Sequence, residues 1–270
     1  MTHETTAPLV RRIDDNGVAT LTLDSPHNRN ALSTRLVDDL AAHLNRAAED
    51  SGIRAVLLTH TGEVFCSGID LTEARTGTGV TAERLTGLLR SVVEAPKPVV
   101  ARVTGHARAG GLGLLGACDI VAAGPAASFA FTEVRIGLAP AVLSTTVLPR
   151  LAPRAASRYY LTGEPFDSAE AARVGLVTIA ADDVDEALEP VLAGLRSAAP
   201  GALAAAKHLT TTDTRRFFAA YASELTALAA RLAGGAEAAE GIASFLERRS
   251  PAWDAASSET SCAPTPLKEP

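Results

Sequence analysis

Residues 96–118 read PKPVVARVTGHARAGGLGLLGAC, and the prediction of the fold starts from this stretch. Val99–Val103 is a short valine-rich run, which is typical of a buried strand. A glycine-containing loop follows at Gly105–Gly111, and the rest of the stretch is apolar. Leu114 and Leu115 suggest that a helix is already under way there. A strand, a loop and a helix in this order predict one unit of an α/β fold.

Further strands and helices are predicted on the N-terminal side and directly after this stretch. Asp15-Asn16-Gly17 lies between two strand-like runs and is typical of a hairpin turn. Ser33 can cap an amphipathic helix that continues to Glu49. The segment Thr72–Thr81 is polar and contains glycine, so we expect it to be mobile. The other predicted elements are strands at Leu9–Ile13, Val18–Leu23, Ala55–Thr59, Ile120–Ala123 and Ser128–Phe131, a loop at Gly62–Asp70 and a helix at Thr81–Glu94.

From Ala141 onward the pattern is mainly helical. The expected helices are Ser144–Leu151, Pro153–Thr162, Ser168–Arg173, Val184–Ser197, Leu203–Leu209 and a longer one from Arg215 to Phe245, with a weak point at Ala233–Gly235. Strands with interleaved helices come first and helices follow. This order favours an α/β core at residues 1–195 and a helical region at 196–253. Residues 254–270 are rich in Ser, Thr, Pro and Ala, and we expect a disordered tail there.

The composition excludes several classes of protein. The 270 residues are 47% apolar and 21% charged, as in ordinary globular chains, and the net charge of −6 provides no basic surface for nucleic acid. Cys66, Cys118 and Cys262 have unrelated spacings, so neither a disulfide framework nor a zinc site is predicted. Met1–Pro8 is polar, and no window approaches the roughly 20 apolar residues of a membrane helix. We therefore expect a cytoplasmic protein.

Gly111–Gly116 matches the G-x-G-x-x-G pattern of dinucleotide-binding folds, and Glu133 lies about where such folds place a ribose-binding carboxylate. Three features count against an NAD site. Thr104–Gly110 separates the pattern from its strand, more than 100 patterned residues precede it, and Leu114 suggests that the helix has already begun. The simpler interpretation is that these glycines allow close helix packing.

Six segments, taken together, carry a family resemblance: Asn30–Ser33, Val64–Leu71, Pro96–Ile120, Phe131–Pro140, Leu161–Val177 and Glu240–Pro251. In this order they resemble the enoyl-CoA hydratase/isomerase, or crotonase, superfamily over about residues 9–253. No one segment is decisive, but six in sequence order are not expected by chance. The sequence of residues 133–140 resembles a branch of methylglutaconyl-CoA hydratase-like members more closely than it resembles the isomerases.

The resemblance implies a fold and a pair of hydrogen-bond donors. The fold is the crotonase spiral, a stack of β-β-α turns, with a C-terminal helical region that builds trimers, often paired into hexamers. The donors are two backbone N–H groups that bind the oxygen of an acyl-CoA thioester, and they correspond here to Ile69 and Gly110. Preorganised donors stabilise the developing enolate, and losing one typically costs about 10²–10³ in rate. The helix after Gly110 should add its positive end, and Gly68 should let the backbone approach the ligand.

The same resemblance implies where CoA lies. The residues expected to bind it are His27, Ser67, Ile69, Asp70 and Leu71, together with Phe245 and Arg248 on the C-terminal helix of a neighbouring subunit. Arg248 would pair with a phosphate, and a solvated helix face is an equally weighted alternative. Because CoA is part of the substrate, we expect no separate cofactor and no metal.

The acid/base groups depart from the family pattern. Hydratases of the family place two glutamates around one water; Glu133 corresponds to one of them, and the other falls on Gly113, which has no side chain. An apolar pocket should raise the pKa of Glu133. His106, Arg108 and Arg135 are candidates to meet a substrate carboxylate, although each could equally be structural.

The predicted function is an enoyl-CoA hydratase-like lyase of fatty acid metabolism, which acts on a 2-enoyl-CoA through the backbone donors and a single glutamate. A lone glutamate is also the pattern of Δ3-Δ2-enoyl-CoA isomerases, and methylglutaconyl-CoA hydratase is a further alternative. A third possibility is a family member that binds acyl-CoA without hydratase activity, which the missing carboxylate at Gly113 would allow.

Overall fold

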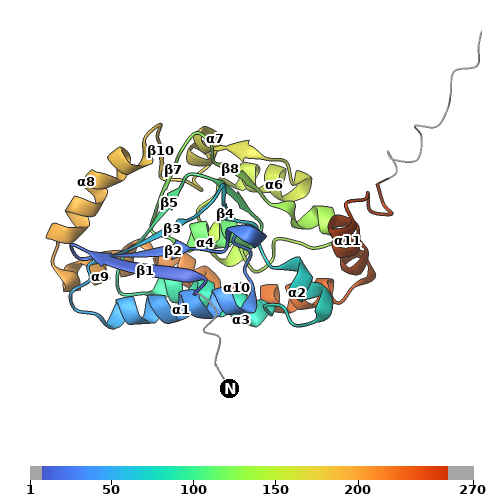
Figure 1. Ribbon diagram of the computed structural model, residues 1–270, viewed down its shortest axis with the longest axis horizontal. Coiled ribbons are helices and arrows are strands. Elements are labelled where there is room, and N and C mark those ends of the chain that lie inside the picture. The colour runs from blue at the N-terminus through green and yellow to red at the C-terminus, as the bar shows by residue number, and fades with distance from the viewer. Residues whose placement is uncertain (1–7, 255–270) are drawn as a thin grey trace, which may run out of the picture.

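The computed structural model describes residues 8–254, and two β-sheets form its centre (Figure 1). The larger sheet has the order β1-β2-β3-β5-β7-β10 and the smaller one β4-β6-β8-β9. The strands of the larger sheet are β1 (Val10–Asp15), β2 (Val18–Leu23), β3 (Ala55–His60), β5 (Val99–Val103), β7 (Ile120–Ala123) and β10 (Ile179–Ala180). Those of the smaller sheet are β4 (Val64–Cys66), β6 (His106–Arg108), β8 (Ser128–Ala130) and β9 (Phe166–Asp167).

Successive strand pairs build a spiral. Each of the pairs β3/β4, β5/β6 and β7/β8 places its first strand in the larger sheet and its second in the smaller one. The strands β2, β3, β5, β7 and β10 pair in parallel, as do β4, β6 and β8. This is the predicted mixed α/β spiral of β-β-α turns, and its parallel strands are buried by helices, as parallel sheets require.

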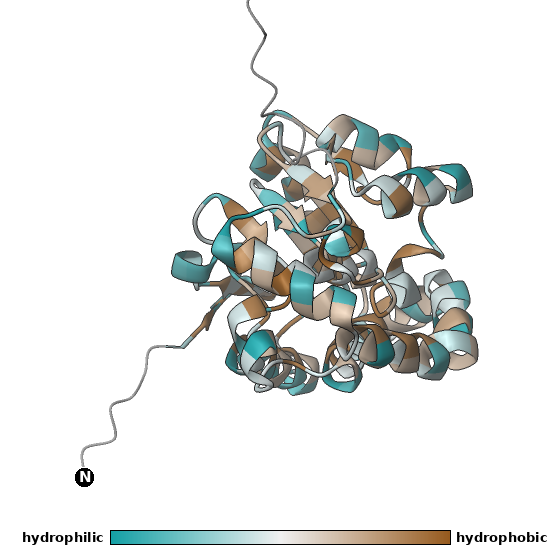
Figure 2. Ribbon diagram, turned by 90° about the vertical axis from the view of Figure 1, so that its right-hand side faces the viewer, coloured by the Kyte–Doolittle hydropathy of each residue, from teal (hydrophilic) through white to brown (hydrophobic). Residues whose placement is uncertain are grey.

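Most helices pack on the outside of the spiral. The helices are α1 (Thr34–Glu49), α2 (Leu71–Thr76), α3 (Ala82–Glu94), α4 (Gly110–Ala117), α5 (Ser144–Val147), α6 (Pro153–Thr162), α7 (Ser168–Arg173), α8 (Val184–Ser197), α9 (Pro200–Thr210), α10 (Thr212–Ala233) and α11 (Ala236–Glu247), with 3₁₀ turns η1 (Pro26–Asn28) and η2 (Thr132–Ile136). Of these, α4 and α5 are buried. Figure 2 shows hydrophilic and hydrophobic residues interleaved along the outer helices, as expected for helices with one buried face. None of the helices in residues 8–254 is long and apolar enough to cross a membrane.

Local sequence signals explain several boundaries. The β1–β2 hairpin turns at Asn16 and Gly17, which both have positive φ (46° and 79°), the geometry for which Asn-Gly is favoured. The Ser33 hydroxyl accepts a hydrogen bond from the Leu36 N–H and caps α1, as predicted. The predicted long helix is interrupted at Gly234 and Gly235, between α10 and α11, at the predicted weak point.

The expectation of a mobile segment at Thr72–Thr81 is wrong for its first half, which forms α2. Asp70 Oδ1 accepts hydrogen bonds from the N–H groups of Thr72 and Glu73 and so caps the helix. Gly77, with a φ of 73°, ends it. The helix at Ser144 is shorter than expected, since it stops at Val147. Apart from Asp254, the predicted disordered tail lies outside the described residues.

Candidate active site

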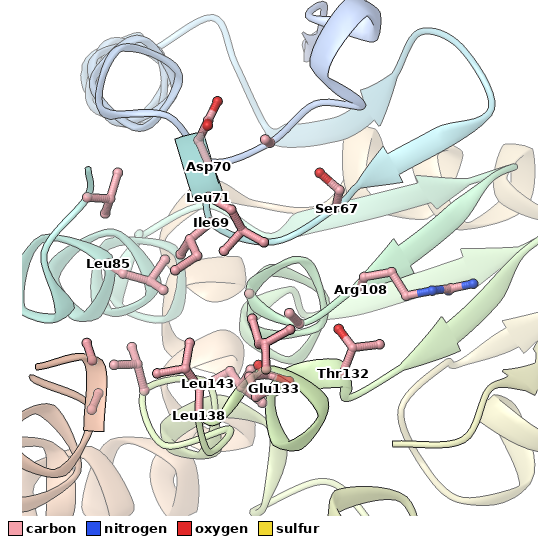
Figure 3. Close-up of a pocket in the computed structure, with 18 of the residues that line it drawn as sticks. Ser67, Ile69, Asp70, Leu71, Leu85, Arg108, Thr132, Glu133, Leu138 and Leu143 are labelled. Atoms are coloured by element: carbon pink, nitrogen blue, oxygen red, sulfur yellow. The ribbon is translucent and has the colours of Figure 1, made fainter. Parts of the chain in front are cut away.

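A cavity of about 950 Å³ lies beside the end of β6 in the smaller sheet and is lined in part by the C-terminal helices (Figure 3). Its wall combines η1, the turn from β4 into α2, the start of α3, the start of α4, η2 with the loop that follows it, and the ends of α10 and α11. The predicted catalytic residues Ile69, Gly110 and Glu133 all line it. Segments that lie far apart in the sequence therefore meet at one site.

Hydrogen bonds to the segment before α1 orient the Ile69 N–H. The Leu32 N–H donates to the Gly68 carbonyl over 2.7 Å, and the Asp70 N–H donates to the Leu32 carbonyl over 3.3 Å. This bridge uses the residues on either side of Ile69, and within residues 8–254 the Ile69 N–H itself has no protein acceptor. Because the Ile69 N–H lies trans to the Gly68 carbonyl across one planar peptide, and this carbonyl points at Leu32, the Ile69 N–H faces away from Leu32.

The second donor lies at the start of α4. Gly110 is the first residue of this helix, so its N–H has no partner within the helix. Ala109 precedes it with a φ of 48°, an unusual conformation for a residue with a side chain, and its own N–H donates to the Ala130 carbonyl. The positive end of α4 adds to the attraction of Gly110 for a negatively charged oxygen.

The two donor loops touch. Gly68 has a φ of 93°, and a Cβ added to it would lie 2.8 Å from the Cβ of Ala109 and 3.4 Å from the Gly110 nitrogen. Only glycine fits here, both for its backbone conformation and for this close approach. The contact places the N–H groups of Ile69 and Gly110 on adjacent loops in the wall of one cavity, the arrangement required to share one oxygen.

Glu133 is the buried carboxylate of the cavity. It lies on η2, only 7% of its surface is exposed, and its Oε2 has no hydrogen-bond partner within residues 8–254. Burial raises the pKa of Glu133 to about 7, as expected for an apolar pocket. A carboxyl group with this pKa can both accept and donate a proton near neutral pH.

Among residues 8–254, no second carboxylate reaches the place above Gly113. A Cβ on Gly113 would lie 2.9 Å from the Cβ of Leu143 and 3.2 Å from Cδ1 of Leu89, so leucine side chains fill the space. The other carboxylates in the cavity wall are Asp70 and Glu83. Asp70 caps α2 and accepts a hydrogen bond from Asn28 Nδ2, and Glu83 is exposed at the start of α3.

The structure brings most of the predicted CoA-binding residues together. His27, Ser67, Ile69, Asp70, Leu71 and Phe245 all line the cavity. Arg248 does not: it is the exposed residue that ends α11, in a left-handed conformation. Phe245 lines the cavity of its own chain, and the expected contribution of Phe245 and Arg248 to the site of a neighbouring subunit stays a prediction. Sequence reasoning missed Arg29, an exposed cation in the wall that directly precedes the Asn30–Ser33 segment.

The three candidates for a substrate carboxylate are held by other groups. Arg108 Nη1 donates to the carbonyls of Ser128 (2.6 Å) and Ala107 (2.9 Å), and its guanidinium points away from Glu133 in Figure 3. Arg135 Nη2 donates to the Thr162 carbonyl, and His106 bonds the Ser128 hydroxyl outside the cavity wall. These contacts favour a structural role for the three residues over binding of a substrate carboxylate.

Two features of the sequence prove to be structural. Gly111–Gly116 lies inside α4, which is buried along its whole length, as the packing interpretation predicted and a dinucleotide site would not allow. Cys66 and Cys118 are buried and free, and burial raises the pKa of each thiol to about 12, which excludes a reactive thiolate near neutral pH. Residues 8–254 hold no group of His, Cys, Asp and Glu side chains suited to a metal ion.

A comparison with known protein families agrees with this fold and site. Residues 14–256 match the model of the enoyl-CoA hydratase/isomerase family. The chain therefore belongs to this family and to the crotonase superfamily. This membership supports the predicted enzyme class, enoyl-CoA hydratase, and is also compatible with an isomerase.

Individual relatives agree with this assignment. A solved enoyl-CoA hydratase from Mycobacterium avium is 47% identical, with a TM-score of 0.84 over 92% of this chain and 100% of that one. A protein named probable enoyl-CoA hydratase from Rhodobacter capsulatus is 37% identical over 87% of this chain and 93% of its own length. The 1,2-epoxyphenylacetyl-CoA isomerase of Escherichia coli is 32% identical over 88% and 95%. The names of these relatives thus include both hydration and isomerisation.

Proposed function

We propose that this chain is a hydro-lyase that adds water to a 2-enoyl-CoA thioester, with Glu133 as its single acid/base. One observation carries the proposal: the buried carboxylate of Glu133, whose Oε2 has no hydrogen-bond partner within residues 8–254, shares a cavity with the N–H groups of Ile69 and Gly110. The names of several relatives support it. CoA would enter past Ser67 and Leu71, with His27 and Arg29 near its phosphates.

The proposed reaction needs only these groups. Ionised Glu133 accepts a proton from water while the water oxygen bonds to C3 of the enoyl group. The π electrons move to the thioester oxygen, and the N–H groups of Ile69 and Gly110 stabilise the resulting enolate. Glu133 then returns the proton to C2, which completes the addition and restores the carboxylate. The raised pKa of Glu133, about 7, suits a group that performs both transfers.

Isomerisation is a second candidate, because Leu143 fills the place of the second carboxylate. An isomerase needs no ordered water. In that reaction Glu133 would take a proton from C2 of a 3-enoyl-CoA and return it at C4 through the same enolate. Binding of acyl-CoA without turnover is the third candidate. Self-association as a trimer or hexamer, a cytoplasmic location and the lack of a separate cofactor stay predictions.

The experiment follows the absorbance of the conjugated enoyl thioester. Wild-type protein is mixed with crotonyl-CoA, with a longer 2-enoyl-CoA and with a 3-enoyl-CoA. Loss of absorbance with the 2-enoyl substrates, abolished by Glu133→Gln, supports hydration. A gain of absorbance with the 3-enoyl substrate alone would support isomerisation instead. Glu83→Gln is the matched control, since Glu83 also lines the cavity but is exposed. No turnover together with tight binding of a saturated acyl-CoA would leave only the third candidate.

A further inference from the structure

One side of the cavity, the side that would hold the acyl group, is apolar. Leu85, Leu138 and Leu143 gather on one side of Ile69 and Glu133 in Figure 3, and Ser67 and Arg108 lie on the other. Val80, Ala82, Ala139, Ala141, Val142 and Leu246 line the same cavity. A substrate whose thioester oxygen is held by Ile69 and Gly110 therefore has a hydrocarbon surface available on one side only.

Small side chains keep the far end of this apolar side open. Ala229, Ala230 and Ala233 on the last turns of α10 line the cavity, and Ala230 and Ala233 are exposed. Phe245 on α11 is 48% exposed beside them. The cavity volume of about 950 Å³ lies at the upper end of the roughly 300–1,000 Å³ typical of ligand sites. A four-carbon acyl group would leave most of this apolar wall uncovered.

The charges on this side disfavour an acyl carboxylate. Arg108 lies on the opposite side from the leucines in Figure 3, Arg135 donates to the Thr162 carbonyl, and His27 and Arg29 lie in η1 and directly after it. Glu83 lies on the first turn of α3, next to Ala82 and close to Leu85 in the sequence, and would repel a second negative charge. Burying an unpaired carboxylate against the leucines is strongly unfavourable.

We infer that the acyl group is an uncharged, extended hydrocarbon chain longer than crotonyl, that its distal carbons run along the alanine face of α10, and that Ala230 and Ala233 set the length accepted. This inference rests on the proposed enoyl-CoA chemistry. It sets aside the methylglutaconyl-CoA alternative, whose substrate carries a carboxylate.

The test compares crotonyl-CoA with trans-2-decenoyl-CoA. Wild-type kcat/KM should be about tenfold or more higher for the longer chain, because each buried methylene adds binding. Ala230→Trp should lower kcat/KM for decenoyl-CoA about tenfold and leave crotonyl-CoA within about twofold. Ala220→Trp is the matched control: Ala220 is exposed on the same helix, lies outside the cavity wall and should leave both substrates unchanged. Equal effects of Ala230→Trp on both substrates, or a wild-type preference for crotonyl-CoA, would overturn the inference.

A binding measurement separates this inference from the proposed reaction. Calorimetry with saturated butyryl-CoA, decanoyl-CoA and glutaryl-CoA requires no turnover. Decanoyl-CoA should bind most tightly, and glutaryl-CoA should bind no better than butyryl-CoA. This order would support the acyl inference even if every enoyl-CoA proved inert, which would refute only the hydratase proposal. Tightest binding of glutaryl-CoA would refute the acyl inference. Ala233→Leu gives the same comparison should the tryptophan variant fold poorly.

Discussion

Leu143 stands in the space that a side chain at position 113 would occupy, with its Cβ 2.9 Å from an ideal Cβ on Gly113. Both residues are buried, and Leu89 closes the same space from α3. Where the family pattern has a second glutamate, this chain thus has close packing between α4, α3 and the segment that contains Leu143. A single substitution cannot supply the second carboxylate.

Gly113→Ala should destabilise the protein by about 1–3 kcal/mol, because the added methyl group overpacks the contact with Leu143. Urea unfolding measures the loss. Gly194→Ala in α8 is the control: nothing lies within 4 Å of a Cβ there, and the change should stabilise the protein by about 0.5–1 kcal/mol. Combining Gly113→Ala with Leu143→Gly, which removes the Leu143 Cβ, should cost less than the sum of the two single changes. Simple additivity would show that the two side chains do not compete for this space.

The rate should follow the ionisation of Glu133. Since the proposed base acts in its ionised form, kcat/KM should rise with pH and level off above the pKa of about 7. Glu133→Gln should lower kcat/KM by about 10²–10⁴ and remove this limb of the profile. A pH-rate profile with crotonyl-CoA or decenoyl-CoA measures it. A rising limb that persists in Glu133→Gln would assign the titration to another group.

The same carboxyl group should make stability depend on pH. Its pKa is higher in the folded protein, about 7, than the ordinary value of 4.5, so the folded state binds this proton more tightly than the unfolded state. The stabilisation is complete below about pH 4.5 and is lost as the pH rises to about 7, with a total of about 3 kcal/mol.

Urea unfolding between these two pH values measures the decline, and Glu133→Gln should remove its share of it. The variant should then be more stable than wild type above pH 7, where an ionised buried carboxylate no longer weakens the fold. Equal pH dependence in both proteins would contradict a raised pKa at Glu133.

Asn30 should position the Ile69 donor without touching substrate. Its buried side chain accepts a hydrogen bond from the Ser25 N–H and donates to the carbonyls of Thr61 (3.0 Å) and Val64 (2.7 Å). Leu32, two residues after Asn30, exchanges backbone hydrogen bonds with Gly68 and Asp70. The bonds of Asn30 tie this segment to Val64 in β4, the strand that precedes Gly68. Asn30→Ala removes one buried and two partly buried hydrogen bonds and should cost about 1–3 kcal/mol or more.

The informative readout for Asn30 is kcat of the folded fraction. A loosened Leu32–Gly68 bridge should lower kcat about tenfold or more, with little change in KM. Asn30→Asp keeps the acceptor for Ser25 and should recover part of the loss. Wild-type kcat in folded Asn30→Ala would reduce Asn30 to a purely structural role.

Much of the fold was predictable because its signals are local. The Asn16-Gly17 turn, the Ser33 cap and the apolar periods of α1, α3, α6 and α8 each depend on a few neighbouring residues, and their predicted positions agree with the structure. The short strands β4, β6, β9 and β10 were missed because two or three residues carry no usable period. The helix α2 was missed because its segment is polar and contains glycine, which predicted a mobile loop.

The sequence by itself determined the family, and it predicted the two backbone donors and the acid/base Glu133, since each depends on residue types at fixed places along the chain. Only the tertiary structure decided that Gly68 and Ala109 touch, that Leu143 rather than a carboxylate fills the place above Gly113, and that Phe245 of the same chain reaches the cavity while Arg248 does not. These facts depend on contacts between residues far apart in the sequence, and packing fixes such contacts only when the whole chain has folded.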